Sequence, residues 1–273
     1  MFIALEQAEK KPEGVLSRLR GILIRPRLWL EPAKCLGGRY ALLKWEGRGE
    51  PDWNAVENIC GTYANRLLLP EGMSPPPESR AKRLSMPGYE NRVLMKTACE
   101  IIDRTRMPMY RRVLGFVDMG ADYAFMLDKL LMHFTAVKVL TKNSGAYEEA
   151  SAHIMDSLGA PMMLAGDLSS LDDCVLILSP GSVFTDMPAP RRCPVMAGGP
   201  FVANGKFCLI NGLVAEPFRE AIDECPDGIN PHEFAGALYE YCGVEATSFI
   251  AGKLLYDYQI IGLDGAVARI NSQ

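Results

Sequence analysis

A chain of 273 residues with 48% hydrophobic and 23% charged residues is typical of a globular protein that forms one large or two smaller domains. No uncharged apolar run reaches the roughly 18 residues that span a bilayer, and the opening residues MFIALEQAEKK do not form a secretory signal. The composition therefore predicts a cytoplasmic protein that has no membrane partner.

The net charge of −4 is unevenly divided along the chain. Residues 1–112 carry 20 Lys and Arg against 13 Asp and Glu, whereas residues 113–273 carry 9 against 20. A division of this size indicates two units with different surfaces. We expect the basic half to dock on the acidic half or on a second copy of the chain, which would make a homo-oligomer; binding of nucleic acid is the less favoured alternative.

The N-terminal half reads as a small α/β domain that covers residues 1–88. Branched and aromatic residues in 19–30 and 39–47 predict two strands, and Asp52 is placed to cap a helix that starts at Trp53. Three consecutive prolines in the polar stretch 70–88 predict a flexible linker at the end of this domain.

The second predicted domain, residues 89–273, begins with an amphipathic helix over 89–105. From Arg111 to Gly181 strands alternate with helices, including a long helix over 119–134, another over 144–159 and a short one in DLSSLDD. This rhythm predicts an α/β fold: a Rossmann-like, doubly wound, mostly parallel sheet.

Beyond Gly181 the alternation continues. Further strands are expected in RRCPVMAGG and KFCLINGLVAEP, followed by a helix over FREAIDEC. Asn230 and Pro231 mark the start of the last predicted helix, and Leu263-Asp264-Gly265 predicts a hairpin turn between two final strands.

The turn after the first strand of this sheet is the candidate nucleotide site. In a dinucleotide fold it reads G-x-G-x-x-G, which lets the backbone approach a pyrophosphate. Here the turn is Asp118-Met119-Gly120-Ala121-Asp122-Tyr123, so only Gly120 occupies a glycine position. Asp118 and Asp122 add negative charge where the phosphates would lie, and the fingerprint is eroded.

The second strand ends in Thr141-Lys142-Asn143, where an acid would favour NAD and a basic residue would favour the 2′-phosphate of NADP. This polar-basic-polar triplet, together with the later CVLILSPGS, resembles the shikimate dehydrogenase and methylenetetrahydrofolate dehydrogenase type within the NAD(P)-binding superfamily. The resemblance covers about residues 111–200 and implies that Lys142 contacts NADP and that Ser179 and Gly181 lie near the nicotinamide. The catalytic Lys/Asp pair of those families has no recognisable counterpart in residues 1–110.

The same turn also resembles the Asp-x-Gly start of the S-adenosylmethionine site of methyltransferases, through Asp118-Met119-Gly120. That resemblance implies a ligand with a positive sulfonium and no phosphate. Asp122 departs from the pattern, as does the absence of an acid at the end of the second strand.

Other functional motifs are sparse. The three histidines lack metal-ligand spacing, the eight cysteines lack CxxC spacing, and the thiols are expected to be reduced and mostly buried. A pocket at the carboxyl ends of the strands would be rimmed by Asp118, Gly120, Ser179, Gly181, Ser182 and Gly198.

The sequence thus predicts a Rossmann-like protein that is non-catalytic or a divergent relative of NAD(P)-dependent oxidoreductases. An active NADP-dependent oxidoreductase and a methyltransferase-like protein are the alternatives. The candidate cofactor-binding residues are Asp118, Gly120, Thr141, Lys142, Ser179 and Gly181, and the expected partner is a small nucleotide.

Overall fold

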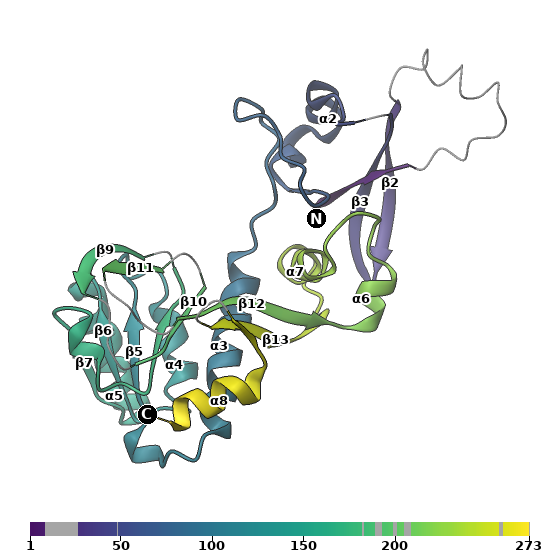
Figure 1. Cartoon of the computed structure of the whole chain (residues 1–273). Helices are drawn as coiled ribbons and strands as arrows, with labels where there is room; N and C mark the ends of the chain where they lie inside the picture. The colour runs from purple at the N-terminus through teal and green to yellow at the C-terminus, as the bar shows by residue number, and fades with distance from the viewer. Residues whose placement is uncertain are drawn as a thin grey trace. The chain divides into compact units, whose positions relative to one another are not determined.

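The computed structural model divides the chain into two compact units (Figure 1). Unit 1 comprises Met1–Tyr89 and Pro217–Ser248, and unit 2 comprises Glu90–Glu216 and Phe249–Gln273. None of the helices in the described part of the chain combines the length and the apolar composition that crossing a bilayer requires. The described residues are 1–8, 27–47, 49–181, 183–188, 193–198, 201–204, 209–256 and 259–272.

Residues 217–248 pack with the N-terminal part of the chain and not with the parallel sheet. Unit 1 is therefore assembled from two segments that are far apart in the sequence.

Unit 1 is built on a four-stranded sheet of order β2-β3-β1-β4. The strand β1 pairs in parallel with both β3 and β4, and β2 pairs antiparallel with β3 through a two-residue turn at Leu36 and Gly37, both at positive φ. The bounds of the strands are Ile3–Gln7 (β1), Arg27–Cys35 (β2), Gly38–Glu46 (β3) and Leu67–Leu68 (β4).

Helices cover both faces of this sheet. On one face, Val56 of α2 (Trp53–Cys60) joins Leu5, Leu43 and Trp45 in a buried core. On the other, Phe234 of α7 (Pro231–Cys242) packs edge-on against the stacked rings of Phe2 and Tyr40. Unit 1 also contains the 3₁₀ turn η1 (Gly61–Asn65) and α6 (Arg219–Asp223).

The helix caps in unit 1 follow the sequence signals. The Asp52 carboxylate accepts hydrogen bonds from the backbone amides of Asn54 and Ala55 at the start of α2. The side-chain oxygen of Asn230 accepts one from the His232 amide at 2.9 Å at the start of α7, and Gly243 ends that helix at φ +68°.

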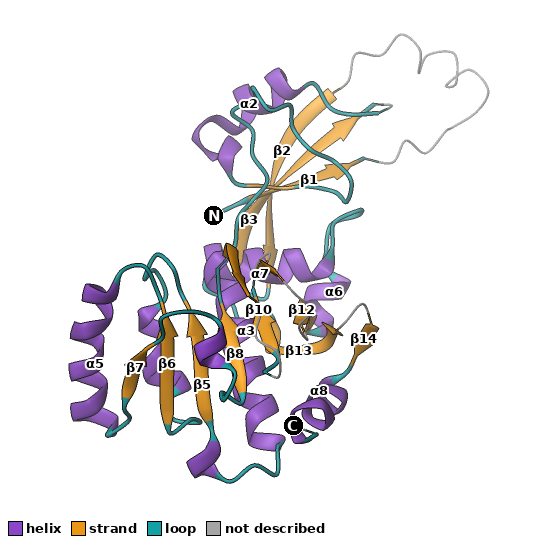
Figure 2. Cartoon of the chain, turned by 60° about the vertical axis from the view of Figure 1, so that its left-hand side comes forward, coloured by secondary structure: helices purple, strands orange, loops and turns teal. Residues whose placement is uncertain are grey.

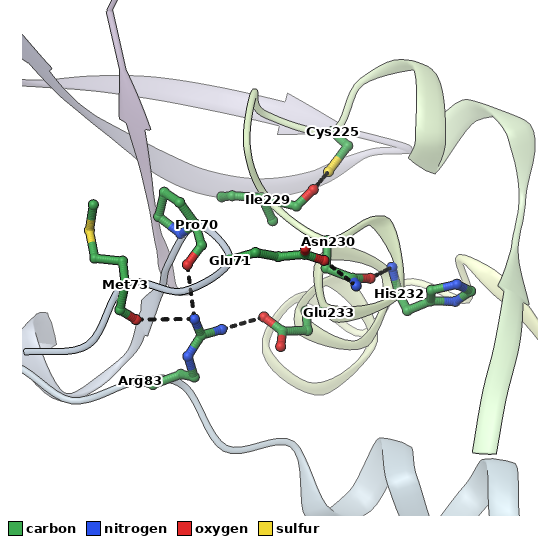
Figure 3. Close-up of polar contacts among 9 residues, drawn as sticks. All are labelled: Pro70, Glu71, Met73, Arg83, Cys225, Ile229, Asn230, His232 and Glu233. Carbon is green, nitrogen blue, oxygen red and sulfur yellow. Dashed lines mark hydrogen bonds and ion pairs between the residues drawn. The ribbon is translucent and has the colours of Figure 1, made fainter. Parts of the chain in front are cut away.

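The proline-rich stretch 70–86 is packed against unit 1, which corrects the prediction of a flexible linker. Figure 3 shows the Arg83 guanidinium donating to the carbonyl oxygens of Pro70 and Met73 and pairing with Glu233 of α7. The Arg83 and Glu233 charged groups are 2.6 Å apart. The Glu57 carboxylate of α2 accepts hydrogen bonds from the Ser79 hydroxyl at 2.6 Å and from the amide of the next residue at 2.8 Å. Partners far away in the sequence fix a segment whose own composition indicates flexibility.

Unit 2 contains an eight-stranded sheet of order β14-β13-β12-β10-β8-β5-β6-β7. From β12 to β7 every neighbouring pair is parallel, and β13 and β14 form an antiparallel hairpin. The bounds are Val113–Val117 (β5), Ala136–Leu140 (β6), Met162–Leu164 (β7), Leu176–Ser179 (β8), Val195–Ala197 (β10), Leu209–Pro217 (β12), Thr247–Tyr256 (β13) and Gln259–Ile261 (β14).

The strand order confirms the predicted fold class. Numbered along the chain, the six parallel strands β5, β6, β7, β8, β10 and β12 have the spatial order 3-2-1-4-5-6, which is that of the doubly wound dinucleotide-binding fold. A separate pair of parallel strands, β9 (Val183–Pro188) and β11 (Phe201–Asn204), follows β8 and β10.

In the described part of unit 2, four helices accompany the sheet, and Figure 2 shows α5 on the side where β7 forms the edge. They are α3 (Pro87–Arg104), α4 (Leu127–Leu130), α5 (Ser144–Leu158) and α8 (Leu263–Asn271). Three 3₁₀ turns complete the unit: η2 (Met109–Arg111), η3 (Ala124–Met126) and η4 (Ser169–Leu171).

Three predicted elements of unit 2 differ in the structure. The long helix expected over 119–134 is reduced to η3 and the single turn of α4, and DLSSLDD forms only η4. Leu263-Asp264-Gly265 does not turn a hairpin but begins α8, where Asp264 lies in the first turn. The hairpin joins β13 to β14 before that point.

Candidate site at the carboxyl end of the parallel sheet

Ligands of open α/β sheets bind beyond the carboxyl ends of the strands, where the strand order reverses. In unit 2 this switch point lies between β5 and β8, which are hydrogen-bonded neighbours (Figure 2). The residues that follow β5, β6 and β8 therefore define the candidate site.

Asp118, the first residue after β5, is buried with 3% of its surface exposed. Its Oδ1 accepts a hydrogen bond from the Asp122 amide at 3.2 Å, and its Oδ2 accepts one from the Tyr123 amide at 2.8 Å. The Tyr147 hydroxyl of α5 donates a third, at 2.7 Å, to Oδ2. These three donors satisfy the buried carboxylate.

The Asp118 carboxylate therefore binds the backbone amides that follow the first strand. In a dinucleotide fold, amides in this position face the pyrophosphate. The capture also explains the missing helix: Ala121 is held at φ +63° in the turn, and regular helical structure starts only at Ala124. The amides of Asp122 and Tyr123 are thus already bonded to a carboxylate of the same turn.

The negative charge of Asp118 opposes the binding of an anion close to it. Two unit charges about 4 Å apart repel by about 4 kcal/mol at an effective dielectric constant of about 20. A phosphate bound at this distance from Asp118 would lose about three orders of magnitude in affinity. The turn therefore disfavours a pyrophosphate in the usual position.

Tyr147 is an essential part of this arrangement and was not identified from the sequence. It has 1% exposure, and burial, followed by its hydrogen bond to Asp118, raises its pKa well above the usual value. The hydroxyl consequently remains a donor over the physiological pH range. Its spacing from Ile154, seven residues later on the buried side of α5, is the signal that could have indicated a buried hydroxyl in need of a partner.

Two further features fill the turn. A Cβ at Gly120 would meet the carboxylate of Asp122, so a larger residue here would displace that side chain. Beyond it, the ring of Tyr123 lies against Gly181 after β8, since a Cβ on Gly181 would be 3.2 Å from Tyr123 Cε2. A tyrosine ring thus occupies space between the ends of β5 and β8.

Thr141 and Lys142 follow β6 beside this turn. The Lys142 amide donates a hydrogen bond to the Met119 carbonyl at 3.3 Å, and the Lys142 side chain is exposed. The Thr141 hydroxyl oxygen accepts one from the Asn143 amide at 3.1 Å. Lys142 therefore presents an exposed ammonium group beside the turn that follows β5.

Ser179 and Gly181 lie at the end of β8. Ser179 is fully buried, and its hydroxyl donates to the Gly181 carbonyl at 3.2 Å, while the Gly198 amide donates to the Ser179 carbonyl at 2.8 Å. Ser182, the remaining predicted rim residue, lies outside the described residues. The structure thus brings Asp118, Gly120, Thr141 and Lys142 together and places the Ser179 side chain in the interior.

An open cavity of about 510 Å³ in unit 1 is lined by residues of α2 and of the proline-rich stretch, among them Trp53, Glu57, Pro76 and Arg80. A second, of about 370 Å³, lies beside Trp29. Within the described ranges no group of three or more His, Cys, Asp or Glu residues is arranged to hold a metal ion.

Comparisons with known proteins give only distant similarity. No protein-family model matches the sequence, and neither does any curated protein. Among solved structures, the iminosuccinate reductase of Paracoccus denitrificans, in complex with NAD+, is 18% identical with a TM-score of 0.31 over 46% of this chain. The Δ1-pyrroline-2-carboxylate reductase of Thermococcus litoralis, in complex with NADH and L-proline, is 8% identical with a TM-score of 0.28 over 45% of this chain.

L-tryptophan dehydrogenase from Nostoc punctiforme is 12% identical with a TM-score of 0.33, and the match covers 86% of this chain and 68% of that one. The chain spans 41% of the length of each of the two reductases. All three proteins are reductases or dehydrogenases by name. The assignment of the Rossmann-like fold rests on the order and direction of the strands.

Proposed function

We propose that this protein is a divergent, non-catalytic relative of the nicotinamide-dinucleotide-dependent oxidoreductases. It has kept the parallel sheet, but its phosphate-binding turn, residues 118–123, is blocked. The observation that carries the proposal is the buried Asp118 carboxylate, which accepts hydrogen bonds from the amides of Asp122 and Tyr123. The Tyr123 ring against Gly181 and the reduction of the following helix to the single turn of α4 support it. The protein then acts through contacts with other proteins.

A second copy of the chain is the partner that this proposal favours. β7 is an edge strand with the exposed apolar side chains of Met163 and Leu164, so it can pair with a strand of a second copy. Light scattering on the purified chain tests this, with a dimer or larger oligomer as the expected result. A monomer at micromolar concentration would contradict it.

The second candidate function is an NADP-dependent oxidoreductase. The exposed Lys142, whose amide is bonded to the Met119 carbonyl of the β5 turn, favours it, as does the strand order. In this alternative Lys142 binds the 2′-phosphate, and Asp118 and Tyr123 rearrange to admit the remainder of the cofactor. The finer choice of NADP over NAD rests on Lys142 alone.

Thermal unfolding with NAD+, NADH, NADP+, NADPH and S-adenosylmethionine, each at 5 mM, separates these functions. A ligand that binds only the folded state at 100 times its Kd adds about 2.7 kcal/mol of stability. We expect no rise in melting temperature with any dinucleotide. A rise with NADP+ that Lys142→Ala removes would establish the second candidate instead, and a rise with S-adenosylmethionine alone would point to the methyltransferase-like alternative.

The proposal also places the protein in the cytoplasm. All seven described cysteines are free thiols, as suits a reducing compartment. Localisation of a tagged full-length chain is the direct test.

A further inference from the structure

Three of the free thiols gather around one end of the unit 1 sheet. Cys35 ends β2, Cys242 ends α7, and Cys225 lies between α6 and α7. Cys35 and Cys242 come from the two separate segments that build unit 1. A bond between them would join these segments covalently.

The position of Cys242 relative to Cys35 follows from the hairpin register. Cys35 pairs directly with Gly38 across the β2–β3 turn, so a Cβ on Gly38 would share its face of the sheet and lie about 5 Å from the Cys35 Cβ. The same Gly38 Cβ position is only 2.9 Å from the Cys242 Cβ. The two cysteine Cβ atoms are therefore within about 8 Å of each other.

A disulfide requires about 4 Å between Cβ atoms, so the pair must approach by up to about 4 Å. Cys242 is the last residue of α7 and is followed by Gly243 in the left-handed region, a residue that permits the backbone at the helix end to move. Its thiol now donates to the Arg39 carbonyl at 3.2 Å, one residue beyond Gly38.

The environment keeps both thiols protonated in reducing conditions. Burial, followed by a hydrogen bond to the Glu224 carboxylate, raises the pKa of Cys35 to about 12. Burial also raises the pKa of Cys242. The pair is stable as thiols and reacts only with a sustained oxidant.

We propose that Cys35 and Cys242 form a redox-sensitive clip that locks α7 onto the β2–β3 hairpin when the protein meets a peroxide. Cys242, which is only partly buried, first loses its proton to solvent and attacks the peroxide as the thiolate: an S–O bond forms, the O–O bond breaks, and the leaving hydroxide takes up a proton to become water. The Cys35 sulfur then attacks the Cys242 sulfur: the S–S bond forms, the S–O bond breaks, and the sulfenic oxygen leaves as hydroxide, which combines with the Cys35 proton to give the second water. Two thiols and one hydrogen peroxide yield one disulfide and two waters.

Peptide mapping of the full chain without reductant, after treatment with millimolar hydrogen peroxide, tests the clip. We expect a cross-linked peptide pair that contains Cys35 and Cys242 and loses two hydrogens, and we expect dithiothreitol to reverse it. Since the wild-type chain is mapped, the result does not depend on whether a variant folds.

Variants supply the matched controls. Cys242→Ser should abolish the cross-link, whereas Cys225→Ser should leave it unchanged. Oxidation should also raise the melting temperature by about 5 °C or more when it is followed by tryptophan fluorescence, because Trp29, Trp45 and Trp53 all belong to unit 1. A link from Cys35 to Cys225, sulfinic acid on Cys242 without a link, or unmodified thiols after prolonged exposure would each overturn the proposal.

Discussion

The hydrogen bond between Tyr147 and Asp118 gives the sharpest test of the proposal that the phosphate-binding turn, residues 118–123, is blocked. Tyr147→Phe keeps the buried ring and removes only the hydroxyl that donates to Oδ2 at 2.7 Å. A hydrogen bond to a charged group contributes about 1.5–3 kcal/mol, so we expect the variant to lose about 2 kcal/mol. Asp118→Asn should lower the free energy of unfolding by about 3–4 kcal/mol, because the new amide NH₂ must face a hydrogen-bond donor and the negative charge is gone.

Native-state hydrogen exchange measures this effect where it acts. The Tyr123 amide, bonded to Asp118 at 2.8 Å, should exchange about 30-fold faster in Tyr147→Phe, which corresponds to about 2 kcal/mol. The double variant should lose at least about 1 kcal/mol less than the sum of the single variants, since they share one interaction.

An internal control comes from the tryptophans. Because all three lie in unit 1, the urea midpoint followed by tryptophan fluorescence should not move in Tyr147→Phe. If the Tyr123 amide of Tyr147→Phe exchanged within threefold of the wild-type rate, the Tyr147 hydroxyl would not stabilise the turn. The proposal that this phosphate-binding turn is blocked by the Asp118 hydrogen bonds would then be refuted.

Three further predictions concern the stability of unit 1. Gly38→Ala should destabilise unit 1 by about 1–3 kcal/mol in urea unfolding, because the new Cβ would lie 2.9 Å from the Cβ of Cys242, the last residue of α7. The control Gly145→Ala should be neutral or slightly stabilising, because its new Cβ would have no atom within 4 Å. Equal effects of the two substitutions would contradict the packing argument. Asn230→Ala should cost about 0.5–2 kcal/mol through loss of the α7 cap, and an unchanged midpoint would show that the cap is dispensable. The hydrogen bond from the Ser79 hydroxyl, followed by those from the next residue, lowers the pKa of Glu57 from 4.5 to about 2. The stabilising contribution of the Glu57 carboxylate is therefore complete above about pH 4.5 and is lost as the pH falls towards 2. In acid unfolding followed by fluorescence, Glu57→Gln should lose less stability over this pH window than the wild type.

Features with local causes could be predicted from the sequence. The alternation of strands and helices from Arg111 onward specified the parallel sheet, and Asn230-Pro231 fixed the start of α7 because capping depends on adjacent residues. The sequence also showed that the turn at Asp118 lacks most glycines of the dinucleotide-binding motif, because that motif consists of a few consecutive positions.

Features with distant causes could not. The helix after β5 fails to form because Asp118 holds the turn with help from Tyr147, 29 residues later. The proline-rich stretch is fixed by Glu57 and Glu233, neither of which its own composition reveals. Leu-Asp-Gly serves a hairpin and a helix start equally well, and only the pairing of β14 with β13 decides between them.

The two-segment construction of unit 1 has a consequence for synthesis on the ribosome. Phe2 and Tyr40 emerge early, but Phe234, which covers them, is made only after the whole strand set β5–β12. At 5–20 residues per second the nascent chain passes from residue 89 to residue 248 in roughly 8–30 s. During this interval the apolar face of the unit 1 sheet that Phe234 later covers is exposed to solvent. A chaperone that shields aromatic surface on the nascent chain should therefore raise the yield of folded protein more than one that acts after release.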